Sequence, residues 1–455
     1  MLYFYFLKLT NLMFVKRPYI LIVVFLFCTS FANAQDFRFI GKNTSQTFNF
    51  KLINNLIIIP VEVNGSKLSF ILDSGVSAPV VFNLTSSDTL ELKNVEKIQI
   101  RGLGTGDPIE ALHSKNNRFR IGNLFAVNKS LFIIYKEQFD LSAKLGITVH
   151  GMIGYDLLKD FVVTINYVTK KITFTKPENY KYRRCSKCET FDLEFYKKKP
   201  YINGEVIVMN SYQKMPVKLL IDSGGSDALW LFEDETFKVP EKAFEDFIGE
   251  GITGSIYGMR SKLKSFSLKS FVFENPNVAY LDSISTYHAK RFKERNGSLG
   301  GGILKRFKVV FDYPNKKITL KKNSMFNNEF GYNMSGIELM HNGKELVKKK
   351  GKAAFIVSQD NEATATNTLY LDVNYDYEFQ PIYNVANIRK DSPAANVGIL
   401  KGDVLVKVNG TFAYNYSIED ILEKLYGDSG KKVRLRINRN GEVIDFEFKL
   451  KDLLE

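Results

Sequence analysis

Two stretches of this 455-residue chain repeat one pattern: an apolar run, Asp-Ser-Gly, a variable residue, Ser and a second apolar run. They read FILDSGVSAPVVF at 70–82 and LLIDSGGSDALWLF at 219–232. A single Asp-Ser-Gly is ordinary turn chemistry, because all three residue types favour turns. Two copies in matching surroundings constrain the chain far more, because both have to suit the same local structure.

The repeat extends beyond these motifs. Alternating apolar strands come before each Asp, and Asn64-Gly65 is the turn signal of a hairpin in the first copy. Each copy closes with a related segment, MIGYDLLKDF in the first and SLGGGILKRF in the second, so that Gly154 aligns with Gly300. Correspondences in one order at nearly constant spacing predict a duplicated β-rich lobe.

The repeated Asp residues suggest a specific chemistry. Two lobes packed about an approximate two-fold axis would bring Asp73 and Asp222 face to face. Close carboxylates cannot both ionise cheaply, so they share one proton. The ionised partner can then take a proton from water while the protonated one hydrogen-bonds a carbonyl oxygen. Gly75 and Gly224 have no side chain that would hold the two loops apart.

The serines of the two motifs can support such a pair. Ser74 and Ser223 are placed to hydrogen-bond across to the opposite loop. Ser77 and Ser226 are expected to hold the outer carboxylate oxygens if the turn brings them back.

These motifs resemble D-[ST]-G-x-[ST] of the aspartic peptidases of the pepsin and retropepsin clan. The closing MIG and SLG resemble the clan's second signature, and the likeness covers roughly residues 45–322. It implies two acid-protease-type β-barrel lobes with Asp73 and Asp222 as the catalytic pair. The supporting residues that it implies are Ser74, Gly75, Ser77, Ser223, Gly224, Ser226, Gly154 and Gly300.

Some features depart from that family's pattern. Both motifs have Ser where Thr is commoner. Substrate-covering flaps are expected at the glycine-bearing stretches 102–106 and 251–254, but the flap Tyr of the pepsin type has only Tyr257 as a candidate. Tyr155 stands where the second copy has Gly301, and its bulk is expected to narrow one side of the cleft.

The C-terminal third has a different pattern. Residues 383–410 resemble a bacterial PDZ domain through Ser392, Pro393, Ala394, Gly398, Gly402, Asp403, Asn409 and Gly410. Such domains add the C-terminal end of a peptide as a strand to an open sheet edge. The carboxylate-binding loop is expected just before a strand at 381–388, and the lysine run 348–350 at an exposed loop tip.

The first 34 residues read as a cleavable signal peptide. A basic pair at 16–17 precedes an apolar run too short to span a bilayer comfortably, followed by a small-x-small site that ends at Ala34. Phe27 before Cys28 argues against lipid attachment. We expect a secreted or periplasmic protein with no stable membrane span after cleavage.

Charge and cysteine content add little specific chemistry. The formal net charge of +14 favours solvated lysine-rich strands, and no motif supports nucleic-acid binding. Cys185 and Cys188 lack the further ligands of a zinc site, which leaves a local disulfide or two free thiols. The four histidines show no ligand spacing. We expect neither a metal nor a cofactor.

Together these patterns predict a mainly β chain with a signal peptide (1–34), two peptidase lobes (35–180 and 181–324) and an α+β PDZ domain (325–455). The predicted function is an aspartic endopeptidase acting on protein or peptide substrates, with the PDZ domain recruiting substrates or partners. A monomer is expected, since one chain supplies both Asp residues. Two alternatives remain: a catalytically silent peptide-binding or scaffold protein, and a basic envelope scaffold indifferent to both Asp residues.

Overall fold

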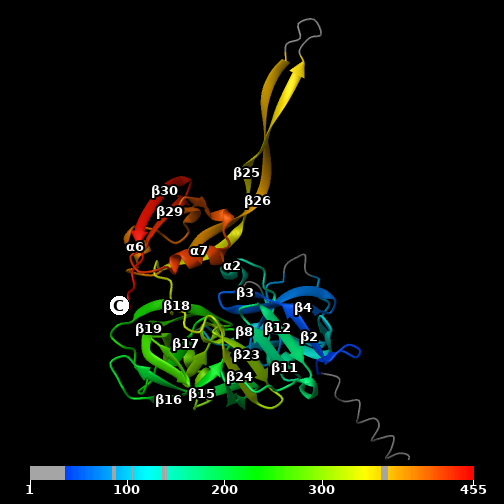
Figure 1. Cartoon of the computed structure of the whole chain (residues 1–455). Helices are drawn as coiled ribbons and strands as arrows, with labels where there is room; N and C mark the ends of the chain where they lie inside the picture. The colour runs from blue at the N-terminus through cyan, green and yellow to red at the C-terminus, as the bar shows by residue number, and fades with distance from the viewer. Residues whose placement is uncertain (1–35, 85–88, 105, 136–138, 140, 360–366) are drawn as a thin grey trace, which may run out of the picture.

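The computed structural model describes residues 36–84, 89–104, 106–135, 139, 141–359 and 367–455. The predicted signal peptide lies outside these residues. The strands form four sheets, and the fold is mainly β as the sequence predicts (Figure 1). No helix in the described ranges is long and apolar enough to cross a membrane.

The first lobe is built on a sheet with the strand order β1-β9-β6-β10-β5-β4-β8-β7, with β3 beside β4. Its strands are β1 (Arg38–Phe39), β3 (Lys51–Ile53), β4 (Leu56–Val63), β5 (Ser66–Leu72), β6 (Val80–Val81), β7 (Val95–Ile100), β8 (Ile109–Ile121), β9 (Leu124–Ile134) and β10 (Gly151–Ile153). Its helices are α2 (Ser142–Leu145) and α3 (Tyr155–Leu158). The hairpin β4–β5 turns at Asn64-Gly65, where both residues have positive φ, as the sequence predicts.

The second lobe repeats this plan in the order β14-β15-β16-β22-β17-β21-β19-β18, with β20 beside β19. Its strands are β14 (Glu194–Tyr196), β15 (Lys199–Val208), β16 (Met215–Ile221), β17 (Leu229–Phe232), β18 (Phe244–Gly251), β19 (Gly254–Leu268), β20 (Phe271–Glu274), β21 (Asn277–Leu281) and β22 (Gly297–Leu299). Its helical segments are α4 (Ser283–Thr286), η2 (Ala289–Arg291) and α5 (Gly301–Leu304).

Strand pairing confirms the duplication. In the first lobe β5 runs parallel to β10, and in the second β16 runs parallel to β22. The short strands β6 and β17 pair antiparallel to the same partners, β10 and β22, in their own lobes. Each Asp-Ser-Gly motif begins directly after β5 or β16, so the topology places both motifs at equivalent points.

A six-stranded sheet joins the lobes. It contains β2 (Ser45–Asn49), β11 (Val162–Asn166), β12 (Lys171–Thr175), β13 (Cys188–Asp192), β23 (Phe307–Asp312) and β24 (Lys317–Lys322). Its order β13-β24-β23-β11-β12-β2 takes three strands from each side of the repeat, which meet where β11 pairs with β23. One continuous apolar core includes buried residues of both lobes. The connection between the lobes carries η1 (Pro177–Asn179) and a local disulfide, Cys185–Cys188.

The C-terminal third forms its own sheet and core, on one side of the lobes (Figure 1). Its elements are β25 (Ile337–Gln359), β26 (Asn367–Ile388), α6 (Pro393–Asn396), β27 (Val404–Val408), β28 (Thr411–Phe412), η3 (Ala413–Asn415), α7 (Ile418–Leu425), β29 (Lys432–Arg439) and β30 (Glu442–Lys449). The side chain of Ser392 caps α6, Ser417 caps α7, and Asn440-Gly441 makes the last hairpin turn. Each follows from its local sequence, because Ser is a favoured helix N-cap and Asn-Gly a favoured hairpin turn.

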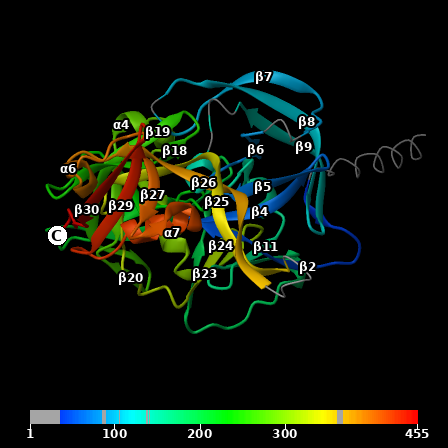
Figure 2. The same cartoon turned by 90° about the horizontal axis from the view of Figure 1, so that it is seen from above.

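A long hairpin of β25 and β26 projects from this domain (Figure 1), and Figure 2 shows the same hairpin from above. The lysine run was expected at a loop tip, and this is wrong. Lys348 pairs with Tyr377 and Lys349 with Asp376, well inside the hairpin. A run of like charges is typical of loops as well as of exposed strands, so the lysines did not show the alternation of apolar and polar residues that would indicate a strand.

The shared sheet generates a first prediction, for Ile165→Ala. Ile165 of β11 is fully buried and pairs with Val309 of β23. We expect a loss of about 2–5 kcal/mol in the free energy of unfolding. Both lobes should unfold at a lower urea concentration, because they share this sheet. Trp230 is the single Trp and lies in the second lobe, so its fluorescence during urea unfolding reports that lobe. Val168→Ala, which truncates an exposed side chain, is the control. An unshifted Trp230 transition in Ile165→Ala would show that the lobes unfold independently.

Candidate active site

The two motifs are locked together by reciprocal hydrogen bonds. The Ser74 hydroxyl donates to the carbonyl of Ile221 (2.6 Å) and accepts from the backbone N–H of Ser223 (3.0 Å). The Ser223 hydroxyl donates to the carbonyl of Leu72 (2.7 Å) and accepts from the N–H of Ser74 (3.0 Å). Both serines are buried. The structure therefore brings the two loops together as the sequence suggests.

Two glycines allow the carboxyl groups to approach. A Cβ on Gly224 would lie 2.3 Å from Cγ of Asp73, and one on Gly75 would lie 3.2 Å from Oδ1 of Asp222. The N–H of Gly75 donates to Oδ1 of Asp73 (2.7 Å), and the N–H of Gly224 donates to Oδ1 of Asp222 (3.1 Å). Each motif thus fixes its own carboxyl through the backbone.

The environment of the pair favours a shared proton. Asp73 is buried and Asp222 half-buried. Burial, followed by the nearby charge of Asp222 and a hydrogen bond between the two carboxyls, raises the pKa of Asp73 to about 8. The Gly75 N–H and the charge of Lys199 oppose this rise. The carboxyl of Asp73 therefore keeps its proton well above the pH at which an ordinary Asp loses it.

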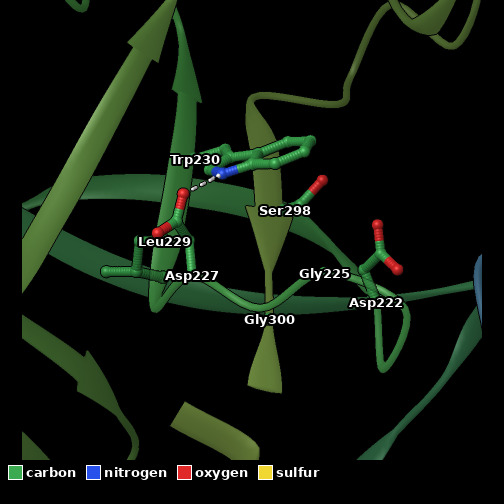
Figure 3. Close-up of a pocket in the computed structure, with 7 residues that line it drawn as sticks. All are labelled: Asp222, Gly225, Asp227, Leu229, Trp230, Ser298 and Gly300. Atoms are coloured by element: carbon green, nitrogen blue, oxygen red, sulfur yellow. Dashed lines mark hydrogen bonds between the residues drawn. The ribbon is translucent and has the colours of Figure 1, made fainter. Parts of the chain in front are cut away.

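The closing glycines lie beside the motifs, as expected. A Cβ on Gly154 would lie 1.8 Å from the carbonyl oxygen of Asp73. A Cβ on Gly300 would lie 2.4 Å from the carbonyl oxygen of Asp227. Figure 3 shows the small cavity at this point, between Asp222 and Trp230. No larger residue fits either glycine position without moving the loop.

Two details of the expected site are wrong. The Ser77 hydroxyl donates to the carbonyl of Lys197 (2.8 Å), not to a carboxylate. The loop containing Ser226 is held through its backbone, where the Ser226 carbonyl accepts from Nδ2 of Asn55 (2.7 Å). The glycines of both turns already supply the N–H donors for the carboxylates, which leaves no comparable role for the outer serines.

The two tyrosines singled out in the sequence do not line the cleft. Tyr155 packs its ring against Phe195 and Tyr313 instead of narrowing the cavity. Tyr257 is 44% exposed and packs on Phe247, outside the cavity wall.

A cavity of about 710 Å³ lies over the carboxyl pair and is roofed by both flaps. The flap stretches meet tip to tip. The N–H of Gly106 donates to the carbonyl of Thr253 (2.8 Å), and the N–H of Thr253 donates to the carbonyl of Leu103 (3.2 Å). A Cβ on Gly251 would lie 1.9 Å from the Leu103 carbonyl oxygen, so the contact requires glycine there. The two flap stretches are thus joined above the carboxyl pair by backbone hydrogen bonds.

Two cations beside the pair could not be predicted from any sequence motif. Lys199, at the start of β15, lies close enough to interact electrostatically with both Asp residues. Arg295 is buried and donates to the Gly297 carbonyl (3.0 Å) and to the Ser298 hydroxyl (2.7 Å). Neither residue belongs to a motif, and only the folded strands bring them to the cleft.

A chain of ion pairs links the C-terminal domain to the second motif loop. Arg389 donates to Asp246 on the flap strand β18 (3.3 Å), and Arg260 of β19 donates to the same carboxylate (2.7 Å). Arg260 also donates to Asp227 (3.2 Å), which accepts from Nε1 of Trp230 (2.9 Å; Figure 3). Both arginines are buried. The C-terminal domain therefore rests on the root of one flap.

The expected position of the carboxylate-binding loop is wrong. The strand at 381–388 belongs to β26, which is paired on both sides, by β25 and by β27. β25 and β30 are the two edges of this sheet, and β25 is the edge that lies against α7 and is preceded by residues 333–336. In that loop Asn333 Oδ1 accepts from the N–H of Ser335 (3.1 Å), and the N–H of Ile337 donates to the Ser335 hydroxyl (3.1 Å). The loop thus satisfies these backbone donors itself.

Comparisons with known proteins agree with this architecture. Residues 59–157 match the family model described as aspartyl protease, and residues 385–439 match that of the PDZ domain. One part of the chain is thus similar to aspartyl proteases and another to PDZ domains. The first match contains Asp73 but ends before the second lobe, so the assignment of Asp222 depends on the repeat and on the hydrogen bonds between the motifs.

Two further similarities are more limited. A probable CtpA-like serine protease from Staphylococcus saprophyticus is 42% identical over 60 residues, which are 13% of this chain and 12% of that protein. The match therefore spans about one eighth of the relative's length. The aspartic proteinase from Irpex lacteus aligns with a TM-score of 0.42 and 12% identity over 62% of this chain and 99% of that one.

The reciprocal hydrogen bonds generate a second prediction, for Ser74→Ala. This change leaves the buried carbonyl of Ile221 and the N–H of Ser223 without their partner. We expect a loss of about 2–4 kcal/mol in the free energy of unfolding. Ser77→Ala, in the same motif, should cost less than about 1 kcal/mol because that hydroxyl is exposed. Urea unfolding of both variants measures the difference, and equal losses would contradict the assigned roles.

A third prediction concerns pH. Because the pKa of Asp73 is raised in the folded state, its contribution is fully favourable below the ordinary value of 3.8 and is lost as the pH rises towards 8. Asn cannot ionise, so the stability of Asp73→Asn relative to wild type should increase from pH 4 to 8. Thermal unfolding midpoints across this range test the prediction. A constant difference would mean that the folded state does not raise this pKa.

Proposed function

We propose that this protein is an aspartic endopeptidase that hydrolyses peptide bonds with a water activated between Asp73 and Asp222. The observation that carries the proposal is the hydrogen-bonded pair of carboxyls, with Asp73 buried, held by the reciprocal contacts of Ser74 and Ser223. The cavity above them is large enough for several residues of an extended peptide.

The mechanism follows from the asymmetry of the pair. The shared proton resides on Asp73, which donates a hydrogen bond to the carbonyl oxygen of the scissile bond. The carboxylate of Asp222 takes a proton from water, and the oxygen of that water attacks the carbonyl carbon. The tetrahedral intermediate then collapses as Asp222 returns a proton to the leaving nitrogen. The backbone N–H groups of Gly75 and Gly224 keep both carboxyls oriented throughout.

The flaps and the C-terminal domain suggest how substrates reach the pair. The flap stretches cover the carboxyl pair and touch at their tips, so they are placed to hold a bound peptide against the two Asp residues. The PDZ domain is proposed to recruit substrates or partners through the edge of β25 next to α7. The N-terminal pattern and the disulfide support a secreted or periplasmic location, because disulfides persist in oxidising compartments.

One observation favours a second candidate function. The hydrogen bonds from Gly106 to Thr253 and from Thr253 to Leu103 close the roof of the cavity. A chain whose flaps stay closed in this way would hold peptides through its PDZ domain without cutting them.

The decisive experiment incubates purified residues 35–455 with a mixed peptide library from pH 3 to 8. Wild type and Asp222→Asn are compared by mass spectrometry of new termini. We expect internal cuts by wild type and a loss of at least about a thousandfold in the variant, because the general base is removed. The same method reads the first residue of the full-length chain after export, which we expect to be Gln35.

Either unexpected outcome is informative. Cuts that persist in both Asp222→Asn and Asp73→Asn would exclude the aspartic mechanism. A folded wild type that cuts nothing at any pH would favour the peptide-binding function.

A further inference from the structure

The walls of the cavity are strongly basic. Its lining includes five lysine or arginine residues and a histidine, namely Arg101, Lys197, Lys199, Arg291, Arg295 and His288. Among the lining residues that the structure describes, Glu250 is the acid outside the Asp pair. Its carboxylate is already engaged by Lys144 (2.6 Å) and by the Ser255 hydroxyl (3.1 Å). The cavity therefore presents a positive potential to a substrate.

Lys199 is the cation that lies next to the carboxyl pair. It forms no salt bridge with any residue in the described part of the chain, although both Asp residues attract its charge from a distance. Burial and the neighbouring Arg295 lower the pKa of its ammonium group. Both effects oppose the charged form, so an anion brought close to Lys199 would relieve them.

Arg295 adds a second positive charge to the part of the cavity wall that contains Lys199. Its guanidinium is buried and donates to neutral partners, the Gly297 carbonyl and the Ser298 hydroxyl. Its ring neighbour Phe232 and its partner Tyr201 are also neutral. A carboxyl pair that shares one proton carries a single negative charge, which balances only one of the two cations beside it.

A substrate carboxylate would supply the missing charge. We propose that Lys199, backed by Arg295, forms a subsite for a carboxylate side chain, so that the enzyme cuts peptide bonds flanked by Asp or Glu. This inference rests on the proposed peptidase function and specifies its substrate class. Lys199 contacts the substrate, whereas buried Arg295 strengthens the local potential. Because Lys199 is partly buried in the cavity wall, the interaction is stronger here than on an open surface.

The test compares peptide pairs that differ only in Glu or Gln at one position near the scissile bond. The measured quantity is the ratio of kcat/KM for the Glu peptide to that for the Gln peptide. We expect a ratio of about ten or more at one position in wild type. Lys199→Met should reduce this ratio to about one, and Lys199→Arg should retain most of it because the charge is kept.

A matched control removes the same charge elsewhere. Lys214 is largely exposed, pairs with Glu205 and does not line the cavity. Lys214→Met should keep the wild-type ratio. Lys199 could instead act only on the pKa of the Asp pair, and a pH profile of kcat/KM for the Gln peptide tests this second role. In that case Lys199→Met shifts the pH profile but leaves the Glu-to-Gln ratio unchanged.

The outcomes distinguish the carboxylate subsite from the peptidase function on which it rests. A wild type that cuts Glu and Gln peptides equally well at every position would overturn the carboxylate subsite while leaving the peptidase intact. A wild type that cuts neither peptide overturns both proposals. An unchanged ratio in Lys199→Met would place the acidic preference on another cation of the cavity and would overturn the role of Lys199.

Discussion

The rest of the site depends on four hydrogen bonds made by Ser74 and Ser223. Two of them join the serines to each other, and two join their hydroxyls to the carbonyls of Ile221 and Leu72. Two carboxyls that share a proton repel as soon as the proton leaves, so the loops that carry them need a restraint of their own. That restraint is made entirely of neutral groups, and each donor and acceptor in it is buried and satisfied. It therefore works at any state of charge of the Asp pair.

Much of this arrangement could be predicted because the sequence contains two copies of the same lobe pattern. The duplicated motifs, the closing glycines at 154 and 300 and the turn at Asn64-Gly65 are local signals, and each has a direct backbone cause. The outer serines could not be judged in the same way. Whether Ser77 reaches a carboxylate depends on the path of the chain beyond the turn, and the Lys197 carbonyl from the other lobe captures its hydroxyl.

The features that escaped prediction are all long-range. Lys199 enters the cleft because β15 begins there, and Arg389 meets Asp246 because the C-terminal domain packs on a flap. The carboxylate-binding loop was expected before the wrong strand because β25 and β26 form one long hairpin, in which the strand at 381–388 is paired on both sides. An alternating pattern identifies strands in such a segment but does not say which of them ends at the edge of a sheet.

The sheet between the lobes has a consequence for assembly. Each lobe carries one Asp of the pair, and the pairing of β11 with β23 does not require that both strands come from the same chain. Two molecules that exchanged their second lobes would rebuild both Asp pairs with the native contacts, joined by the connection around the Cys185–Cys188 disulfide. A cut in this connection would likewise leave the two fragments in contact through β11, β23 and the shared core. The shared sheet therefore holds the two Asp residues together without help from the covalent connection.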